Sequence, residues 1–276
     1  MATVLQPASR EALAALTERL DAHADGASAR DLTTTADELF AVARFLDGER
    51  AIQRLLADAS SPEETRVDLV NRLLGNQLSQ PTVELVSELA RKRWSKTSDV
   101  VTAAETLARL AAVAVAEKTS SLDEVEDQLF RFGRILGREP QLNSLLADTT
   151  KPVEGRLRLL DEVLGDRVYP VTATLLREAV RLPRGRHLDV VAEQLAELAA
   201  ARRNRSVAKV RTPVELTSEQ EAKLEDTLGR IYGRKISLQV ELDRNLLGGL
   251  VVQVGGEVID GSVAGRLAAA RRSLPS

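Results

Sequence analysis

The chain has 276 residues, which is enough for two or three small domains. It has no cysteine, so disulfides, thiolate catalysis and zinc–thiolate sites are excluded, and the composition suits a reducing compartment. Apolar residues make up 43% and aromatic residues only 3%, which is typical of packed helices, whereas a formal charge of -3 gives no general basic surface for nucleic acid. No apolar run approaches the roughly 18 residues of a membrane span, and Met1 to Pro7 show no signal-peptide pattern. We therefore expect a soluble, intracellular, mostly helical protein.

An internal repeat covers most of the sequence before residue 205. Aligned with itself at an offset of 90, the chain matches without gaps. The matched residues include Asp37, Leu39, Phe40 and Arg44 with Asp127, Leu129, Phe130 and Arg134, Leu55 to Asp58 with Leu145 to Asp148, and Arg66 with Arg156. One register held over so many positions indicates a duplication. The sequence therefore predicts two tandem helical bundles.

Each copy consists of short predicted helices with clear start and stop signals. In the first copy, Ser61-Pro62 predicts a start with the serine hydroxyl as cap and the proline in the first helical position, and Gly75 predicts the stop. A second helix is predicted from about Pro81 to the basic turn Arg91 to Lys96. The second copy repeats these signals at Pro152, Gly165 and the basic turn Arg181 to Arg186.

The segment between the copies, Asp99 to Lys118, is apolar on most of its circumference. A helix of this kind is expected to be buried on more than one side. At the same offset it matches the helix at the start of copy one and the helix at the end of copy two. We therefore expect one long helix that closes the first bundle and opens the second, with domains at 1–112, 99–205 and 206–276.

The pattern changes after the basic run Arg202 to Arg205, which we interpret as an interdomain hinge. A short strand is predicted from Val207 to Thr212, followed by the capping box Thr217 to Gln220 and a helix with Leu224, Leu228 and Ile231 on one face. Strict alternation predicts a strand from Ile236 to Leu242, and the two runs around Gly255-Gly256 predict a hairpin. Ser262 is expected to cap a final helix. The fold class is therefore mostly α, with two tandem bundles and a small α+β C-terminal module.

The C-terminal glycine-rich segment resembles a known family. The residues that carry the resemblance are Asp243, Leu247, Gly248, Gly249, Gly255, Asp260, Gly261 and Ser262. They are similar to the end of the delta subunit of F-type ATP synthase, whose mitochondrial member is the oligomycin-sensitivity-conferring protein. Each repeat copy also resembles the N-terminal helical bundle of that family. Because copy two directly precedes the C-terminal module, as the single bundle of the family does, copy one is the extra piece.

The resemblance implies a non-catalytic stator subunit without cofactor or metal. Its implied partners are an amphipathic N-terminal helix of the alpha subunit, the b subunit of the peripheral stalk and, as a third candidate, the beta subunit. No nucleic acid is implied, and the membrane is reached only through the assembled complex, on the cytoplasmic face of a bacterial cell membrane. The alternative is a free-standing helical-repeat adaptor or regulatory protein, which only the duplicated bundles support.

Most of the signature residues are expected to serve the fold. Gly248-Gly249 predicts a bulge or close backbone approach, and Asp260-Gly261-Ser262 is expected to shape the entry to the last helix. Trp94, Arg181, Arg184 and Arg186 are candidate partner contacts. For the arginines the alternative is a solvated turn that stabilises a helix C-terminus, and for Trp94 it is a buried position in the first bundle.

The duplication leaves two hypotheses for the copies. In the first, copy two keeps the groove for the alpha-subunit helix, because it adjoins the C-terminal module, while copy one braces the head or the stalk. In the second, each copy takes an alpha-subunit helix. The two hypotheses predict different stoichiometries for binding of that helix.

Overall fold

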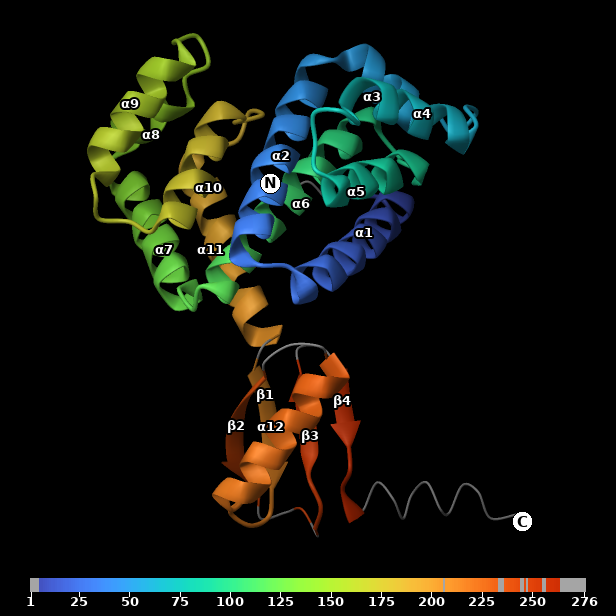
Figure 1. The fold of residues 1–276 in the computed structure, drawn as a ribbon. Coiled ribbons are helices and arrows are strands. Elements are labelled where there is room, and N and C mark those ends of the chain that lie inside the picture. Colours follow the sequence, from blue (N-terminus) through green and yellow to red (C-terminus); the bar gives the residue numbers. More distant parts are fainter. Residues whose placement is uncertain are drawn as a thin grey trace. The chain divides into compact units, whose positions relative to one another are not determined.

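The computed structural model describes residues 5–205, 207–232, 236–243, 246, 248–254 and 257–263. These residues form two compact units, Met1–Ala199 and Ala200–Ser276. The first unit is helical and the second contains a small mixed sheet (Figure 1). The predicted fold class, mostly α with a small α+β module at the C-terminal end, is confirmed.

The helices of the two copies repeat at the same spacing as the sequence. They are α1 Pro7–Gly26, α2 Ala29–Gly48, α3 Arg50–Ala57, α4 Glu63–Leu74, α5 Gln80–Arg91, α6 Thr97–Lys118, α7 Leu122–Arg138, α8 Pro140–Ala147, α9 Val153–Leu164, α10 Pro170–Arg181 and α11 Leu188–Arg205. Adding 90 to both bounds of α3, α4 and α5 gives the bounds of α8, α9 and α10. The duplication read from the sequence is therefore also a duplication of local structure.

A buried arginine shows that the repeat extends to side-chain contacts. Arg66 is 2% exposed and donates to the Leu56 carbonyl at 3.2 Å and to the Lys92 carbonyl at 3.0 Å. Its counterpart Arg156 donates to the Leu146 carbonyl at 3.3 Å. Within each copy, a single buried guanidinium thus connects the short third helix of the bundle to its other helices. Hydrogen bonds to a charged donor contribute about 1.5–3 kcal/mol each.

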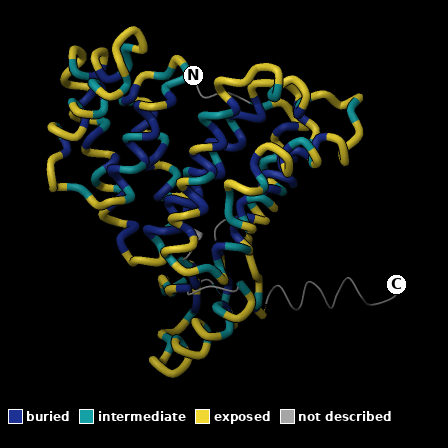
Figure 2. The backbone as a smooth tube through the Cα atoms, turned by 45° about the horizontal axis from the view of Figure 1, so that its top comes forward, coloured by how far each residue is buried: buried dark blue, intermediate teal, exposed yellow. Residues whose placement is uncertain are grey.

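Helix α6 is buried much more completely than its counterpart α1. Fifteen of its 22 residues are buried, whereas α1 buries six of its 20 residues on a single stripe. Helices of both copies pack against it, namely α1, α2, α3 and α5 from copy one and α7 and α10 from copy two. Figure 2 shows the buried residues concentrated along the inside of the helical unit. The domain boundaries drawn from the repeat stay a prediction.

Two predicted helix starts, one in each copy, are wrong in detail. Helices α4 and α9 begin at Glu63 and Val153, so Pro62 and Pro152 occupy the capping position and not the first helical turn. The Ser61 hydroxyl does not cap the helix, because it donates to the Asp58 carboxylate at 3.2 Å. The Ser61 hydroxyl, which the sequence pattern assigned to the helix cap, thus forms its hydrogen bond within the preceding turn.

The C-terminal unit contains β1 Val207–Thr212, α12 Ser218–Tyr232, β2 Ser237–Leu242, β3 Val251–Val254 and β4 Glu257–Asp260. The strand order is β2-β1-β3-β4, with β1 and β2 parallel and the other pairs antiparallel. Helix α12 covers one face of this sheet (Figure 1), and its Leu228 belongs to the same buried apolar cluster as Ala208 and Val252 of the strands. Ile231, predicted on the same face, is 62% exposed, so that prediction is wrong. The Gly255-Gly256 turn and the helix predicted after Ser262 lie outside the described residues.

Candidate docking surfaces

The second basic turn has an unusual backbone. It connects α10 to α11, and the Arg186 N–H donates to the Pro183 carbonyl at 2.9 Å. Arg184 and Gly185 both have positive φ, 48° and 71°. A left-handed conformation costs a residue with a side chain about 1–2 kcal/mol, whereas glycine adopts it freely. Contacts of the Arg184 side chain must offset that cost.

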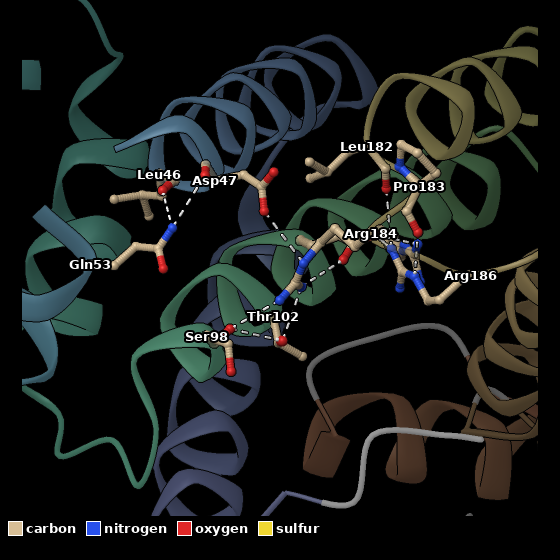
Figure 3. Close-up of polar contacts among 11 residues, drawn as sticks. Leu46, Asp47, Gln53, Ser98, Thr102, Leu182, Pro183, Arg184 and Arg186 are labelled. Carbon is tan, nitrogen blue, oxygen red and sulfur yellow. Dashed lines mark hydrogen bonds and ion pairs between the residues drawn. The ribbon is translucent and has the colours of Figure 1, made fainter. Parts of the chain in front are cut away.

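Arg184 points inward and connects three segments of the helical unit (Figure 3). Its guanidinium donates to the Thr102 hydroxyl at 3.0 Å and to the Ser98 carbonyl at 3.2 Å, both on α6. It also pairs with Glu105 at 3.3 Å and with Asp47, at the end of α2, at 3.6 Å. Because α2 belongs to copy one and the turn to copy two, Arg184 links the two copies.

Glu105 is the centre of a buried charge cluster. Glu105 is only 4% exposed, and its carboxylate pairs with Arg109, Arg184 and Arg186. Burial lowers the pKa of Arg109 to about 10, although the nearby Glu105 carboxylate favours its charged form. A buried carboxylate needs such partners, because an unpaired charge in the interior costs several kcal/mol.

The end of α10 carries a second contact between the copies. Glu178 pairs with Arg181, one helical turn away, and with Arg44 of α2. The Glu178 side chain is 8% exposed, whereas those of Arg44 and Arg181 keep 36% and 40%. Glu178 therefore holds a basic side chain of copy one against copy two.

Trp94 lies in the core of the helical unit. It is 6% exposed, and its indole N–H donates to the Leu89 carbonyl at 3.0 Å. This position favours the buried alternative for Trp94. All four candidate contact residues, Trp94, Arg181, Arg184 and Arg186, make contacts within the chain. Partner contact by any of them stays a prediction.

Three signature glycines, Gly248, Gly249 and Gly261, meet where β3 begins and β4 ends. Gly249 has φ +80°, and a Cβ placed there would lie against the Gly261 carbonyl and 2.9 Å from the Cα of Ser262. The Gly261 N–H donates to the Leu250 carbonyl at 2.9 Å, and the Val263 N–H donates to the Gly248 carbonyl at 2.9 Å. Two backbone segments thus approach more closely here than a side chain at Gly249 would allow.

The acidic signature residues support the same region. The Ser262 N–H donates to the Asp260 carboxylate at 2.9 Å, and hydrogen bonds from Ser262 hold the pKa of Asp260 below its usual value. Asp243 accepts from Arg211 at 3.3 Å, and its own N–H donates to a β1 carbonyl at 2.8 Å. The remaining signature residues, Leu247 and Gly255, lie outside the described residues.

Comparison with known proteins identifies the family. The ATP synthase delta (OSCP) subunit family matches residues 108–274. A protein named ATP synthase subunit delta, from Streptomyces avermitilis, is 44% identical over 98% of each chain. A protein of the same name from Streptomyces griseus is 42% identical over 98% of this chain and 99% of its own. The ATP synthase subunit b-delta of Mycobacterium sp. (strain KMS) is 43% identical over 98% of this chain, which spans 61% of that longer protein. The chain belongs to the ATP synthase delta (OSCP) subunit family.

Membership of the delta family makes the chain a stator subunit of an F-type ATP synthase, a structural and peripheral part of that membrane-bound complex. The family match begins inside α6, so it covers copy two and the C-terminal unit and leaves most of copy one outside. The Streptomyces relatives match over both copies. The alternative of a free-standing adaptor has no support.

Among the residues that the structure describes, no group of three or more His, Cys, Asp or Glu side chains lies close enough together to hold a metal ion. Within the same ranges, no helix is long and apolar enough to cross a lipid bilayer.

Proposed function

We propose that this chain is the non-catalytic link between the catalytic head and the peripheral stalk, and that it holds the head against the torque of the rotor. Its partners in this role are the N-terminal helix of an alpha subunit, the b subunit and, as a further contact, the beta subunit. The complex lies on the cytoplasmic face of a bacterial cell membrane. The observation that carries the proposal is the match to delta subunits over nearly the whole chain.

The name of the mycobacterial relatives supports the b subunit as the neighbour. Those proteins are named b-delta, and this chain accounts for 61% of their length. If one protein combines both subunits, their separate counterparts are expected to lie side by side in the assembled enzyme.

The helical unit has features that suit a static joint. Its two copies share α6, and ion pairs of Glu178 and Arg184 fasten α2 of copy one to copy two. Such a connection resists bending between the copies better than a flexible linker does, because many contacts must break together. Helix-in-groove docking provides a large interface that suits slow dissociation.

Copurification tests the proposal. An affinity tag on this chain, in detergent-solubilised membranes of its own host, is expected to recover the alpha, beta and b subunits together. Deleting the chain is expected to separate the head from the membrane fraction, with ATP hydrolysis by the released head continuing. Recovery of the tagged chain alone, with the head still attached to membranes after deletion, would refute the proposal.

A further inference from the structure

Copy one has a groove between α1 and α5. A hollow of about 400 Å³ lies there, with Ala8, Ala12 and Ala15 of α1 on one side and Glu88 and Arg91 of α5 on the other. Ala8 is exposed and Ala15 half-buried. Small side chains allow another helix to approach closely, since the distance between packed helices depends on the residues at the contact. The Glu88 carboxylate is held ionised by Lys92 and Arg91, which lower its pKa.

The same surface exists in copy two, and there a helix already lies on it. At the offset of 90, α1 and α5 correspond to α6 and α10, and Glu88 corresponds to Glu178. Helix α2 packs along α6, and its Arg44 pairs with Glu178 of α10. The carboxyl of Asp37, also on α2, has a raised pKa because of burial and the nearby Glu178.

The contact between α2 and copy two extends along α10. Near the start of α10, Val171 packs on an apolar cluster that includes Leu32 of α2. Beyond its end, Arg184 reaches Asp47 at the end of α2. The two helices therefore run in the same direction, and α2 contacts copy two near both ends of α10.

Two charged residues that line the groove of copy one have apolar counterparts in copy two. Glu11 lines the groove of copy one and is exposed, whereas its counterpart Val101 is 1% exposed. Lys92 is likewise replaced by Leu182, which is 7% exposed. At these two positions copy two thus has buried apolar residues where copy one has charged residues.

We infer that copy two has its helix-binding groove filled from within the chain by α2, and that the α1–α5 groove of copy one accepts one amphipathic helix of a neighbouring subunit. This inference rests on the proposed function, in which that helix is the N-terminal helix of an alpha subunit. A basic residue of the incoming helix joins Arg91 and Lys92 at Glu88, as Arg44 joins Arg181 at Glu178. Copy one is then the docking site, and the chain binds one such helix.

Titration of the full chain with a synthetic peptide of the alpha-subunit N-terminal helix, from the same organism, tests the inference by calorimetry. One peptide per chain is expected. Ala15→Arg fills the groove and is expected to weaken binding at least tenfold, and Glu88→Lys at least threefold. Ala14→Arg is the matched control: Ala14 is the exposed neighbour on the same helix, so binding is expected to stay unchanged.

Each other outcome has a defined meaning. A stoichiometry of two would show that copy two also binds a helix, and full affinity in Ala15→Arg and Glu88→Lys would place the helix outside the α1–α5 groove; either result would overturn the inference. Absence of peptide binding by a chain that still copurifies with the head overturns the inference and leaves the proposed function standing. A chain that neither binds the peptide nor copurifies with the head would refute both the inference and the proposed function. The fluorescence unfolding midpoint of Trp94 must be the same in the Ala14 and Ala15 variants, which shows that both are folded.

Discussion

Removing the Glu105 carboxylate is expected to destabilise the helical unit strongly. In Glu105→Gln, the guanidiniums of Arg109, Arg184 and Arg186 lose their shared negative partner. Breaking a buried ion pair from one side costs about 3–5 kcal/mol. The Arg184 and Arg186 side chains are 18% and 24% exposed, so water can solvate them in part. We therefore expect a loss of about 3 kcal/mol, at the low end of that range.

The assay is urea unfolding followed by tryptophan fluorescence. Trp94 is the only tryptophan of the chain and lies in the helical core, so this transition reports on that unit and not on the C-terminal sheet. Asp161→Asn is the matched control, because its pair with Arg177 is 45% and 41% exposed and is worth less than about 1 kcal/mol. A loss below about 1 kcal/mol for Glu105→Gln would refute the argument that these arginines depend on Glu105.

Three further substitutions test other features. Gly249→Ala is expected to destabilise the C-terminal unit by about 2 kcal/mol or more, because φ is positive and a Cβ would meet the Gly261 carbonyl. Hydrogen exchange of the β3 amides measures this loss, and Gly155→Ala is the control, since a Cβ at Gly155 would have no atom within 4 Å. Glu88→Gln is expected to lower the unfolding midpoint at pH 7, because the pKa of Glu88 is lower in the folded chain than its usual value of 4.5. The difference from the parent chain should disappear as the pH falls from 4.5 through that lowered pKa, and a difference that stays constant with pH would contradict this. Arg66→Met leaves backbone carbonyls without their donor and is expected to cost about 3 kcal/mol in the tryptophan transition, where a loss under about 1 kcal/mol would contradict it.

The helix pattern was predictable from the sequence because the repeat supplies each signal twice. Gly75 and Gly165 both follow the last residue of a helix, α4 and α9, as predicted. The strands β1, β2 and β3 were predictable for a related reason, since apolar and polar residues alternate along the first two and a glycine pair follows the third.

The failures have local causes. The Ser61 hydroxyl was assigned to a cap, but the Asp58 carboxylate is close enough to accept a hydrogen bond from it. Ile231 has a spacing that suits the buried face of α12, but that face continues from Leu228 to Tyr232, which packs against the sheet cluster, and Ile231 is exposed. A helical pattern allows apolar residues at both i+3 and i+4, so spacing alone does not decide between these two positions.

The inward role of Arg184 could not be predicted from sequence spacing. Its partners Glu105 and Asp47 are separated from it by 79 residues or more, and only the folded helical unit brings them together. A basic turn after a helix usually predicts arginine side chains that lie in solvent. The positive φ at this arginine is a conformational signal that the sequence Pro183 to Arg186 does not reveal.

Sharing one helix between two similar bundles makes the bundles unequal. In copy one, α1 buries only six residues and leaves its groove with α5 open. The corresponding helix of copy two is α6, which is also the last helix of copy one, so α2 necessarily packs beside the groove that α6 forms with α10. Burial of 15 residues on α6 follows from this double use. Double use of α6 thus makes the two grooves unequal, because α2 lies beside the groove of copy two and the groove of copy one stays open.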